Sequence, residues 1–185
     1  MVLIIVLSVF VLLIFVFGFF GGFYKVNIQV NNINGEILVY EDVIGAYNQT
    51  KKVIDKIYYK LLNKFKIETE KGFGIFYDNP KNVEQSKLRS EVGCIIESID
   101  SEMLEQIKKH FKVKTLPNEK YLFAEFPFKG FLSIMIGMVK IYQKFGKYIS
   151  ENNYPDGPIM KIYDVPNKKI IYRKFISDNM EKVIK

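Results

Sequence analysis

The chain has 185 residues, and its 27 Lys and Arg against 20 Asp and Glu give a formal net charge of +7. Apolar residues make up 49% and charged residues 25%, which is the composition of a globular domain rather than of a disordered or fibrous chain. A single cysteine, Cys94, excludes an intramolecular disulfide framework and a cysteine-based zinc site, and a single histidine, His110, excludes a multi-histidine metal site. We therefore expect no metal site and no cofactor.

Residues 1–24 form an apolar segment without Asp, Glu, Lys, Arg, His, Asn or Gln. As a helix it would be about 35 Å long, enough to cross the hydrocarbon core of a bilayer. Aromatic residues gather at its end, where membrane proteins carry an aromatic belt. A cleaved signal peptide would have a basic start, a shorter apolar core and a small-residue cleavage site, and a buried core helix would carry some polar residue. We therefore predict an uncleaved transmembrane signal anchor.

The charges beside this segment predict its orientation. No Lys or Arg precedes it and Lys25 follows it, so the positive-inside rule places the C-terminal domain in the cytosol. A lone cysteine agrees with a reducing compartment. The sequon Asn48-Gln49-Thr50 lies in this domain and is expected to stay without a glycan.

Beyond the anchor, the apolar residues alternate between the period of strands and that of helices. Strands are expected at residues 25–33, 36–47, 72–80, 91–97, 111–116, 119–128, 158–165 and 169–176, and helices at 48–65, 100–110 and 131–151. Asn34-Gly35 favours a type I′ turn, so 25–35 is predicted to be a juxtamembrane hairpin arm that pairs with the next strand. The order is a βαββ unit used twice. We predict an α+β fold with an antiparallel sheet and both long helices on one face.

Short motifs follow this order of elements. They are Ile75-Phe76-Tyr77-Asp78-Asn79-Pro80, then Lys87-Leu88-Arg89, then Val92-Gly93, and in the second half Tyr121 to Phe128, Lys129-Gly130 and Asn152-Asn153-Tyr154. Together they resemble the GyrI-like (SOUL/GyrI effector-binding) domain family over about residues 25–176. Residues 177–185 would then be a short C-terminal tail.

An N-terminal span followed at once by such a domain resembles the membrane-anchored, testis-expressed protein 264-like group of ER-phagy receptors. This resemblance implies a single-pass protein of the endoplasmic reticulum membrane, with a non-catalytic binding or adaptor domain in the cytosol. Those receptors carry a long disordered tail with an Atg8-binding motif, whereas the sequence here ends at Lys185. Any link to the autophagy machinery is therefore expected to run through an intermediary protein.

Two carboxylates are candidates for a ligand site. On a strand, Glu125 shares one face with Tyr121 and Phe123, and Glu91 follows the strand that contains Tyr77. Aromatic walls and one carboxylate suit an organic cation, and the family resemblance implies a buried acidic residue of this kind. Alternatively, each carboxylate lies on a solvated face or pairs with a Lys or Arg of a neighbouring strand. No nucleophile, base and orienting group occur together, so we expect no catalytic residues.

Lysines recur at helical spacing on both long helices. They are Lys52, Lys56, Lys60 and Lys64 on the first helix and Lys140, Lys144 and Lys147 on the second. Such rows attract the headgroups of an anionic leaflet, so we predict that they face membrane lipid. The alternative is an ordinary solvated face. No motif supports nucleic-acid binding.

Overall fold

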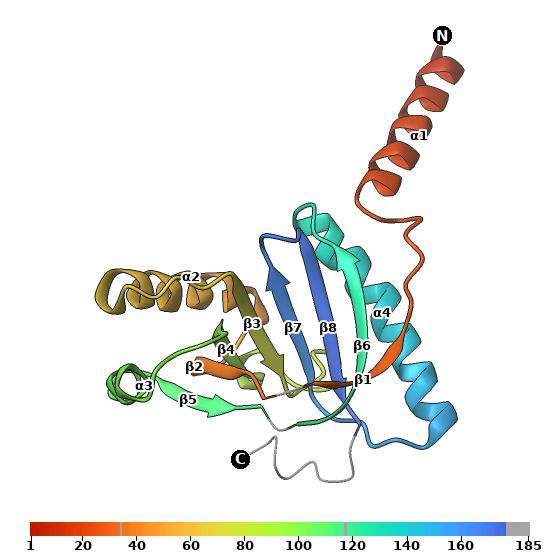
Figure 1. The fold of residues 1–185 in the computed structure, drawn as a ribbon. Coiled ribbons are helices and arrows are strands. Elements are labelled where there is room, and N and C mark those ends of the chain that lie inside the picture. The colour runs from red at the N-terminus through yellow and green to blue at the C-terminus, as the bar shows by residue number, and fades with distance from the viewer. Residues whose placement is uncertain (34, 117, 177–185) are drawn as a thin grey trace.

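The computed structural model describes residues 1–33, 35–116 and 118–176. The first helix, α1 (Val2–Phe19), contains no buried residue, and it is long and apolar enough to cross a membrane. It points away from the rest of the molecule (Figure 1). The boundary at 24 and the tail at 177–185 stay predictions, and the tail lies outside the described residues.

The domain contains two βαββ units, as the apolar periodicity predicts. The first unit consists of β2 (Ile37–Ile44), α2 (Thr50–Lys60), β3 (Lys71–Phe76) and β4 (Arg89–Ile96), and the second of β6 (Glu119–Pro127), α4 (Phe131–Asn152), β7 (Ile159–Asp164) and β8 (Lys169–Phe175). A short strand precedes each unit, β1 (Gln29–Ile33) and β5 (Lys112–Thr115). The remaining helices are α3 (Ser101–Lys108), 3-10 turns at Tyr47–Gln49 and Gln85–Lys87, and a π turn at Leu61–Phe65 that extends α2.

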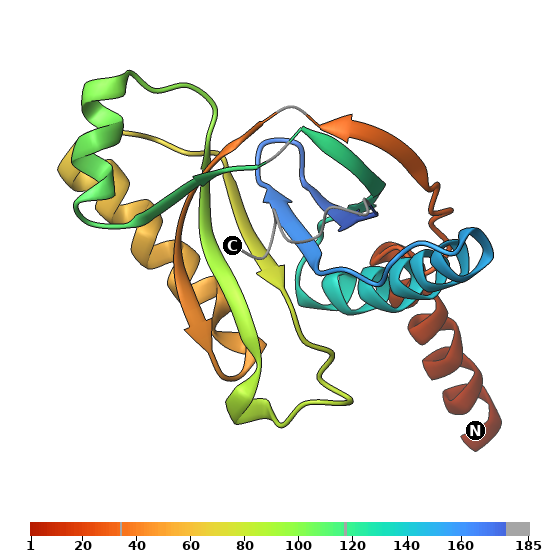
Figure 2. The ribbon, with the colours of Figure 1, turned by 90° about the horizontal axis from the view of Figure 1, so that it is seen from below.

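The described strands form one antiparallel sheet in the order β1-β6-β8-β7-β3-β4-β2-β5. This order is symmetric about the β7–β3 pair. Each short strand leaves its own unit and pairs with the other one, β1 with β6 and β5 with β2. Figure 2 shows the two halves side by side, one with α2 and α3 and the other with α4.

The hairpin prediction for residues 25–35 was wrong, because β1 pairs with β6 and not with β2. The turn signal at Asn34-Gly35 does not decide the pairing. The connection before β2 crosses the connection before β6, so that β1 reaches β6 and β5 reaches β2. Gly35 lies at this crossing, where an added Cβ would lie 2.8 Å from Cγ2 of Thr115 and 3.1 Å from the Leu116 carbonyl oxygen. A glycine there lets the two chain segments pass each other rather than turn back.

Both long helices cover the same face of the sheet. Phe76, Phe126 and Tyr172 pack beneath α4, and Val39, Cys94 and Ile96 pack beneath α2. Because side chains alternate along a strand, the neighbouring residues point to the opposite face. That second face, which we call the inner face, has its own apolar cluster around Leu38, Tyr40, Phe73, Ile75 and Met160.

Candidate ligand-binding site on the inner face

The inner face carries a carboxylate surrounded by aromatic and basic side chains. Strand pairing places Glu91 opposite Ile75 on one side and Asp42 on the other, so all three point to the inner face. Lys114 reaches across from β5 and forms an ion pair with Glu91. Its ammonium group also lies 5.2 Å from the centroid of the Tyr40 ring, within the range of a cation–π contact.

This ion pair is largely removed from water, with the Lys114 side chain 18% exposed and the Glu91 side chain 13% exposed. A carboxylate and an aromatic ring around one ammonium group are the features expected of a site for an organic cation. Here the chain's own lysine occupies that position. Glu91 is therefore paired with a lysine, but this lysine comes from β5, two strands away in the sheet, and not from a neighbouring strand.

Two tyrosines border the same carboxylate. Burial raises the pKa of Tyr40 to about 12, with the negative charges of Glu91 and Asp42 as further causes. Burial also raises the pKa of Tyr77, and the charge of Glu91 raises it further. The Tyr77 hydroxyl is buried, and among the described residues no group, the nearby Glu91 carboxylate included, lies within hydrogen-bonding distance and angle of it. Both phenols therefore stay protonated at neutral pH and can act as hydrogen-bond donors, not as nucleophiles.

The second predicted carboxylate lies elsewhere. Glu125 is on β6, and β8, β7 and β3 separate that strand from β4 and Glu91. The Glu125 carboxylate accepts a hydrogen bond of 2.6 Å from Lys169, and this pair is about one-third exposed. Of its predicted neighbours, Phe123 is half-buried on the inner face, and Tyr121 packs edge-to-face on Phe175. The structure thus divides the predicted site residues into two groups that share no pocket.

A second ion pair lies between these two groups. The Arg173 guanidinium binds both carboxylate oxygens of Glu36, with 3.1 Å from Nη2 to Oε1. The Arg173 side chain is only 8% exposed. A two-point Arg–carboxylate contact of this kind is strong and geometrically specific, so it holds the start of β2 against β8.

A small, partly open cavity of about 10 Å³ lies on the inner face beside Arg173. It is lined by Ile75, Leu116, Tyr121, Pro158, Met160, Arg173 and Phe175. This volume is at the lower limit for a single water molecule, far below the roughly 300–1,000 Å³ of small-molecule sites. This cavity therefore has no room for a small molecule, and neither Glu91 nor Lys114 lines it.

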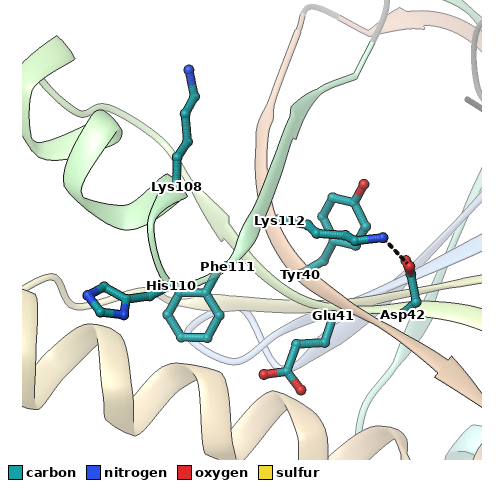
Figure 3. Close-up of a pocket in the computed structure, with 7 residues that line it drawn as sticks. All are labelled: Tyr40, Glu41, Asp42, Lys108, His110, Phe111 and Lys112. Carbon is teal, nitrogen blue, oxygen red and sulfur yellow. Dashed lines mark hydrogen bonds and ion pairs between the residues drawn. The ribbon is translucent and has the colours of Figure 1, made fainter.

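A larger hollow of about 570 Å³ lies at the outer end of β2 and β5, and it is open to solvent. In Figure 3 its side chains diverge: Lys108, His110 and Glu41 point in three different directions. Lys112 and Asp42 converge, and they form an ion pair with each other. Because Lys112 and Asp42 pair with each other and the remaining polar side chains diverge, this hollow lacks the convergent polar groups of a ligand site.

The lysines predicted to face membrane lipid have several different neighbours. On α2, Lys56 pairs with Glu41, Lys60 lies over the Phe111 ring, and Lys64 lies 2.6 Å from Nε2 of His110. On α4, Lys147 is 3.7 Å from Glu151, and Lys140 and Lys144 bind backbone carbonyls of residues 22–26. Lys52 is exposed. Figure 1 shows α4 next to the lower end of α1 and α2 on the opposite side of the domain, so the lysines of α2 and those of α4 do not form one surface.

The sequence analysis did not identify Lys114 or Tyr40 as site residues. A signal for Lys114 is present in Lys112-Val113-Lys114, because alternation on a strand puts both lysines on one face. The sheet order is needed to see that this face is the one that carries Glu91. The deeply buried Cys94 does lie in the core as predicted, and burial raises the pKa of its thiol to about 11, which makes it unreactive.

Comparison with known proteins identifies the fold. The GyrI-like small molecule binding domain matches residues 27–172 of this chain. The chain belongs to the GyrI-like family. The human testis-expressed protein 264 is 30% identical over 99 residues, which are 50% of this chain and 32% of that protein. The match therefore spans only about a third of that relative.

Solved structures share this GyrI-like fold at low sequence identity. A hydrolase encoded by lin2189 from Listeria innocua has a TM-score of 0.54 and 12% identity, covering 84% of this chain and 95% of the other. SAV2435 bound to tetraphenylphosphonium has a TM-score of 0.51 and 12% identity, covering 82% and 94%. EcmrR in its complex with DNA has a TM-score of 0.57 and 9% identity, covering 82% and 57%. At such identities these matches establish the fold alone.

Proposed function

We propose that this chain is a membrane-anchored adaptor of the endoplasmic reticulum, with its GyrI-like domain in the cytosol and its binding activity directed at proteins. The observation that carries the proposal is the Glu91–Lys114 ion pair, in which the chain's own lysine takes the position beside Tyr40 that an organic cation would take. A domain of a small-molecule-binding family whose candidate carboxylate is already paired retains its outer surfaces for recognition. The exposed apolar helix α1 supplies the membrane anchor.

The likeness to testis-expressed protein 264 supports a role related to that of ER-phagy receptors. The segment that best fits an Atg8-binding motif, Tyr40-Glu41-Asp42-Val43, lies in β2, which pairs with β4 throughout and with β5 at Tyr40. Tyr40 is also only 8% exposed. An extended peptide must be free to add a strand to its partner. In the structure this segment is therefore not free to bind an Atg8-family protein. Cross-linking in intact membranes followed by capture of this chain would identify its protein partners.

Catalysis is not part of the proposal. Hydrolysis by a carboxylate and a tyrosine requires a base that is free to accept a proton. Glu91 is paired with Lys114, and burial keeps the Tyr77 phenol protonated. The hydrolase with the same fold shares only 12% of its residues with this chain, so its activity carries no weight for this site.

Glycosylation at Asn48 tests the orientation. Asn48 lies exposed in the 3-10 turn Tyr47–Gln49, so an oligosaccharyltransferase would have access to it if the domain were lumenal. We expect the chain expressed in a eukaryotic cell to show no glycosidase-sensitive mass. A mass shift that Asn48→Gln removes would place the domain in the lumen and contradict the cytosolic adaptor. A sequon added before residue 1 serves as the positive control, because the short end of the anchor would then be lumenal.

A second candidate function is sensing of an organic cation at Glu91. The specific observation in its favour is that Glu91 and Tyr40 already contact an ammonium group, that of Lys114, while Tyr77 borders Glu91. A ligand would have to displace this lysine, at the cost of breaking a buried ion pair. We therefore expect no thermal stabilisation of the wild-type chain by a panel of aromatic cations.

Lys114→Ala removes the resident cation and leaves the Glu91 carboxylate unpaired. We expect this variant to be destabilised by about 3 kcal/mol, because an uncompensated buried charge remains. A small cation at 100 times its Kd would restore about 2.7 kcal/mol, measured as a rise in Tm. Lys112→Ala is the matched control, because it removes a neighbouring and more exposed lysine of the same strand. Stabilisation of the wild type by the same panel, lost in Glu91→Gln, would favour the sensor over the adaptor.

A further inference from the structure

The first half of α4 exposes apolar side chains only. Its exposed large residues are Phe131, Leu132, Met135, Val139 and Tyr142, with exposed fractions from 38% to 72%. At 100° per residue these positions fall within one stripe about 100° wide. From residue 143 onward the exposed positions of the same helix are polar or glycine: Gln143, Lys144, Gly146, Lys147, Ser150, Glu151 and Asn152. We call the apolar set the α4 stripe.

A helix on a domain surrounded by water presents polar residues on its outer face. In the α4 stripe the exposed residues are instead apolar over three turns, whereas those of the second half of the helix are polar or glycine. The change from apolar to polar therefore follows the long axis of α4. Such a gradient is expected of a helix whose first turns lie in an apolar environment and whose last turns lie in water.

The first turn of α4 lies beside the end of α1. A Cβ placed on Gly130 would be 3.8 Å from Cε1 of Phe20, the residue that caps α1. The ammonium group of Lys129 lies 4.5 Å from the centroid of the Phe19 ring. Figure 1 shows the same arrangement, with the lower end of α1 next to the start of α4. The α4 stripe thus begins at the level where the apolar helix ends.

The connection from α1 to the domain is fixed along α4. Lys140 donates hydrogen bonds to the carbonyls of Gly22 and Tyr24 at 2.6 and 2.8 Å, and Lys144 donates to that of Val26 at 2.6 Å. Val26 is buried in the core beneath α4, and Tyr24 packs edge-to-face on Phe126. Because the linker is held at successive points, the domain cannot move far from the plane in which α1 leaves the bilayer.

We propose that the α4 stripe is a membrane-contact surface that lies in the interfacial layer of the same bilayer that α1 crosses. This inference rests on the proposed anchoring by α1. Apolar and aromatic side chains of an interfacial helix are buried about 5–10 Å into the boundary between headgroups and acyl chains. Phe131 and Leu132 lie deepest. Residues 131 and 142 are about 16 Å apart along the helix axis, so α4 is inclined to the membrane surface. Tyr142 then marks the polar limit of the layer, where an amphipathic ring is favoured. The domain is therefore held on the membrane by two contacts rather than suspended from a stalk.

Site-directed fluorescence of the full-length chain in phosphatidylcholine vesicles tests this placement. A polarity-sensitive dye is attached to Leu132→Cys or Val139→Cys, and to Lys147→Cys as the matched control on the same helix. The native Cys94 is buried, so the unsubstituted chain serves as the labelling blank. Lipids with a nitroxide near the glycerol should quench the dye at residue 132 at least about threefold more than at residue 147. Aqueous iodide should show the reverse order.

Three outcomes bear on the proposal. Equal iodide quenching at residues 132 and 147, with no quenching from the lipid, would overturn it. A dye signal at residue 132 that vanishes when the protein is diluted in excess lipid would assign the stripe to a second copy of the chain and would also overturn it. Extraction of the protein by alkaline carbonate would instead refute the anchoring by α1, since a single interfacial helix is held reversibly whereas a transmembrane helix is not.

Discussion

Lys161→Met is expected to raise the stability of the domain by about 2–3 kcal/mol at pH 7. Lys161 is 7% exposed and lies between the sheet and α4, with its ammonium group 4.1 Å from the centroid of the Phe76 ring and 3.4 Å from Sδ of Met138. Burial lowers its pKa from 10.5 to about 8. That difference corresponds to about 3 kcal/mol of unfavourable free energy for the charged form. Methionine fills nearly the same volume without the charge.

The effect has a defined pH dependence. The pKa of Lys161 is lower in the folded than in the unfolded state, so the unfolded chain binds more protons between about pH 8 and 10.5. Wild-type stability should therefore rise with pH across this window. Tyr163 and Tyr172 belong to the same core, and burial raises their pKa values, so ionisation of tyrosine in the unfolded state reverses the trend above about pH 10. The useful range is pH 7–9.5.

Thermal unfolding of the full chain in mild detergent, followed by near-ultraviolet circular dichroism, measures this effect. We expect Lys161→Met to raise Tm by about 5 °C at pH 7 and to flatten the profile up to pH 9.5. Lys161→Arg keeps a charge that cannot be titrated in this range and should lower Tm at every pH. A methionine variant with unchanged Tm and an unchanged pH profile would mean that water or another group already solvates the ammonium.

The order and type of the helices and strands were predictable because each has a clear apolar period. Residues 131–151 read as one amphipathic helix, and the structure has α4 at Phe131–Asn152. The pairing of β1 was not predictable, since consecutive strands are neighbours in only about two-thirds of cases and Asn34-Gly35 imitates a hairpin turn. Pairing across units depends on contacts between distant parts of the chain that local sequence does not encode.

The candidate site, too, was predictable only where it depends on local sequence and not where it depends on contacts between distant parts of the chain. Tyr77 and Glu91 were predicted from local sequence, Tyr77 in the motif Ile75 to Pro80 and Glu91 beside Val92-Gly93. Their partner Lys114 comes from β5, a strand that pairs with β2 and lies two positions from β4 in the sheet. Only this order shows that a lysine fills the site expected for a ligand, and that Glu125 belongs to a different part of the inner face. The chain order alone does not reveal that Lys114 reaches Glu91.

Gly93→Ala is expected to destabilise the domain by more than about 4 kcal/mol, which is enough to unfold most of the population. Gly93 lies in β4, paired with Tyr40 of β2 and Phe73 of β3. A Cβ at this position would lie 1.9 Å from the Val39 carbonyl oxygen and 2.8 Å from Cα of Tyr40. These are backbone atoms, so no side-chain rotation relieves the overlap, and β2 would have to move away from β4. Loss of soluble expression, or a collapse of Tm, is the expected measurement.

Gly146→Ala is the matched control, because an added Cβ at residue 146 in α4 meets no atom within 4 Å. It should stabilise the helix by about 0.5–1 kcal/mol, which separates the loss of glycine in general from the overlap at residue 93. A Gly93→Ala variant as stable as the wild type would contradict the pairing of β2 with β4. It would also remove the basis for placing Tyr40 beside Glu91, since this close approach of the two backbones sets the distance between them. Within the Val92-Gly93 motif, the glycine thus determines the position of Tyr40 relative to Glu91 through backbone geometry.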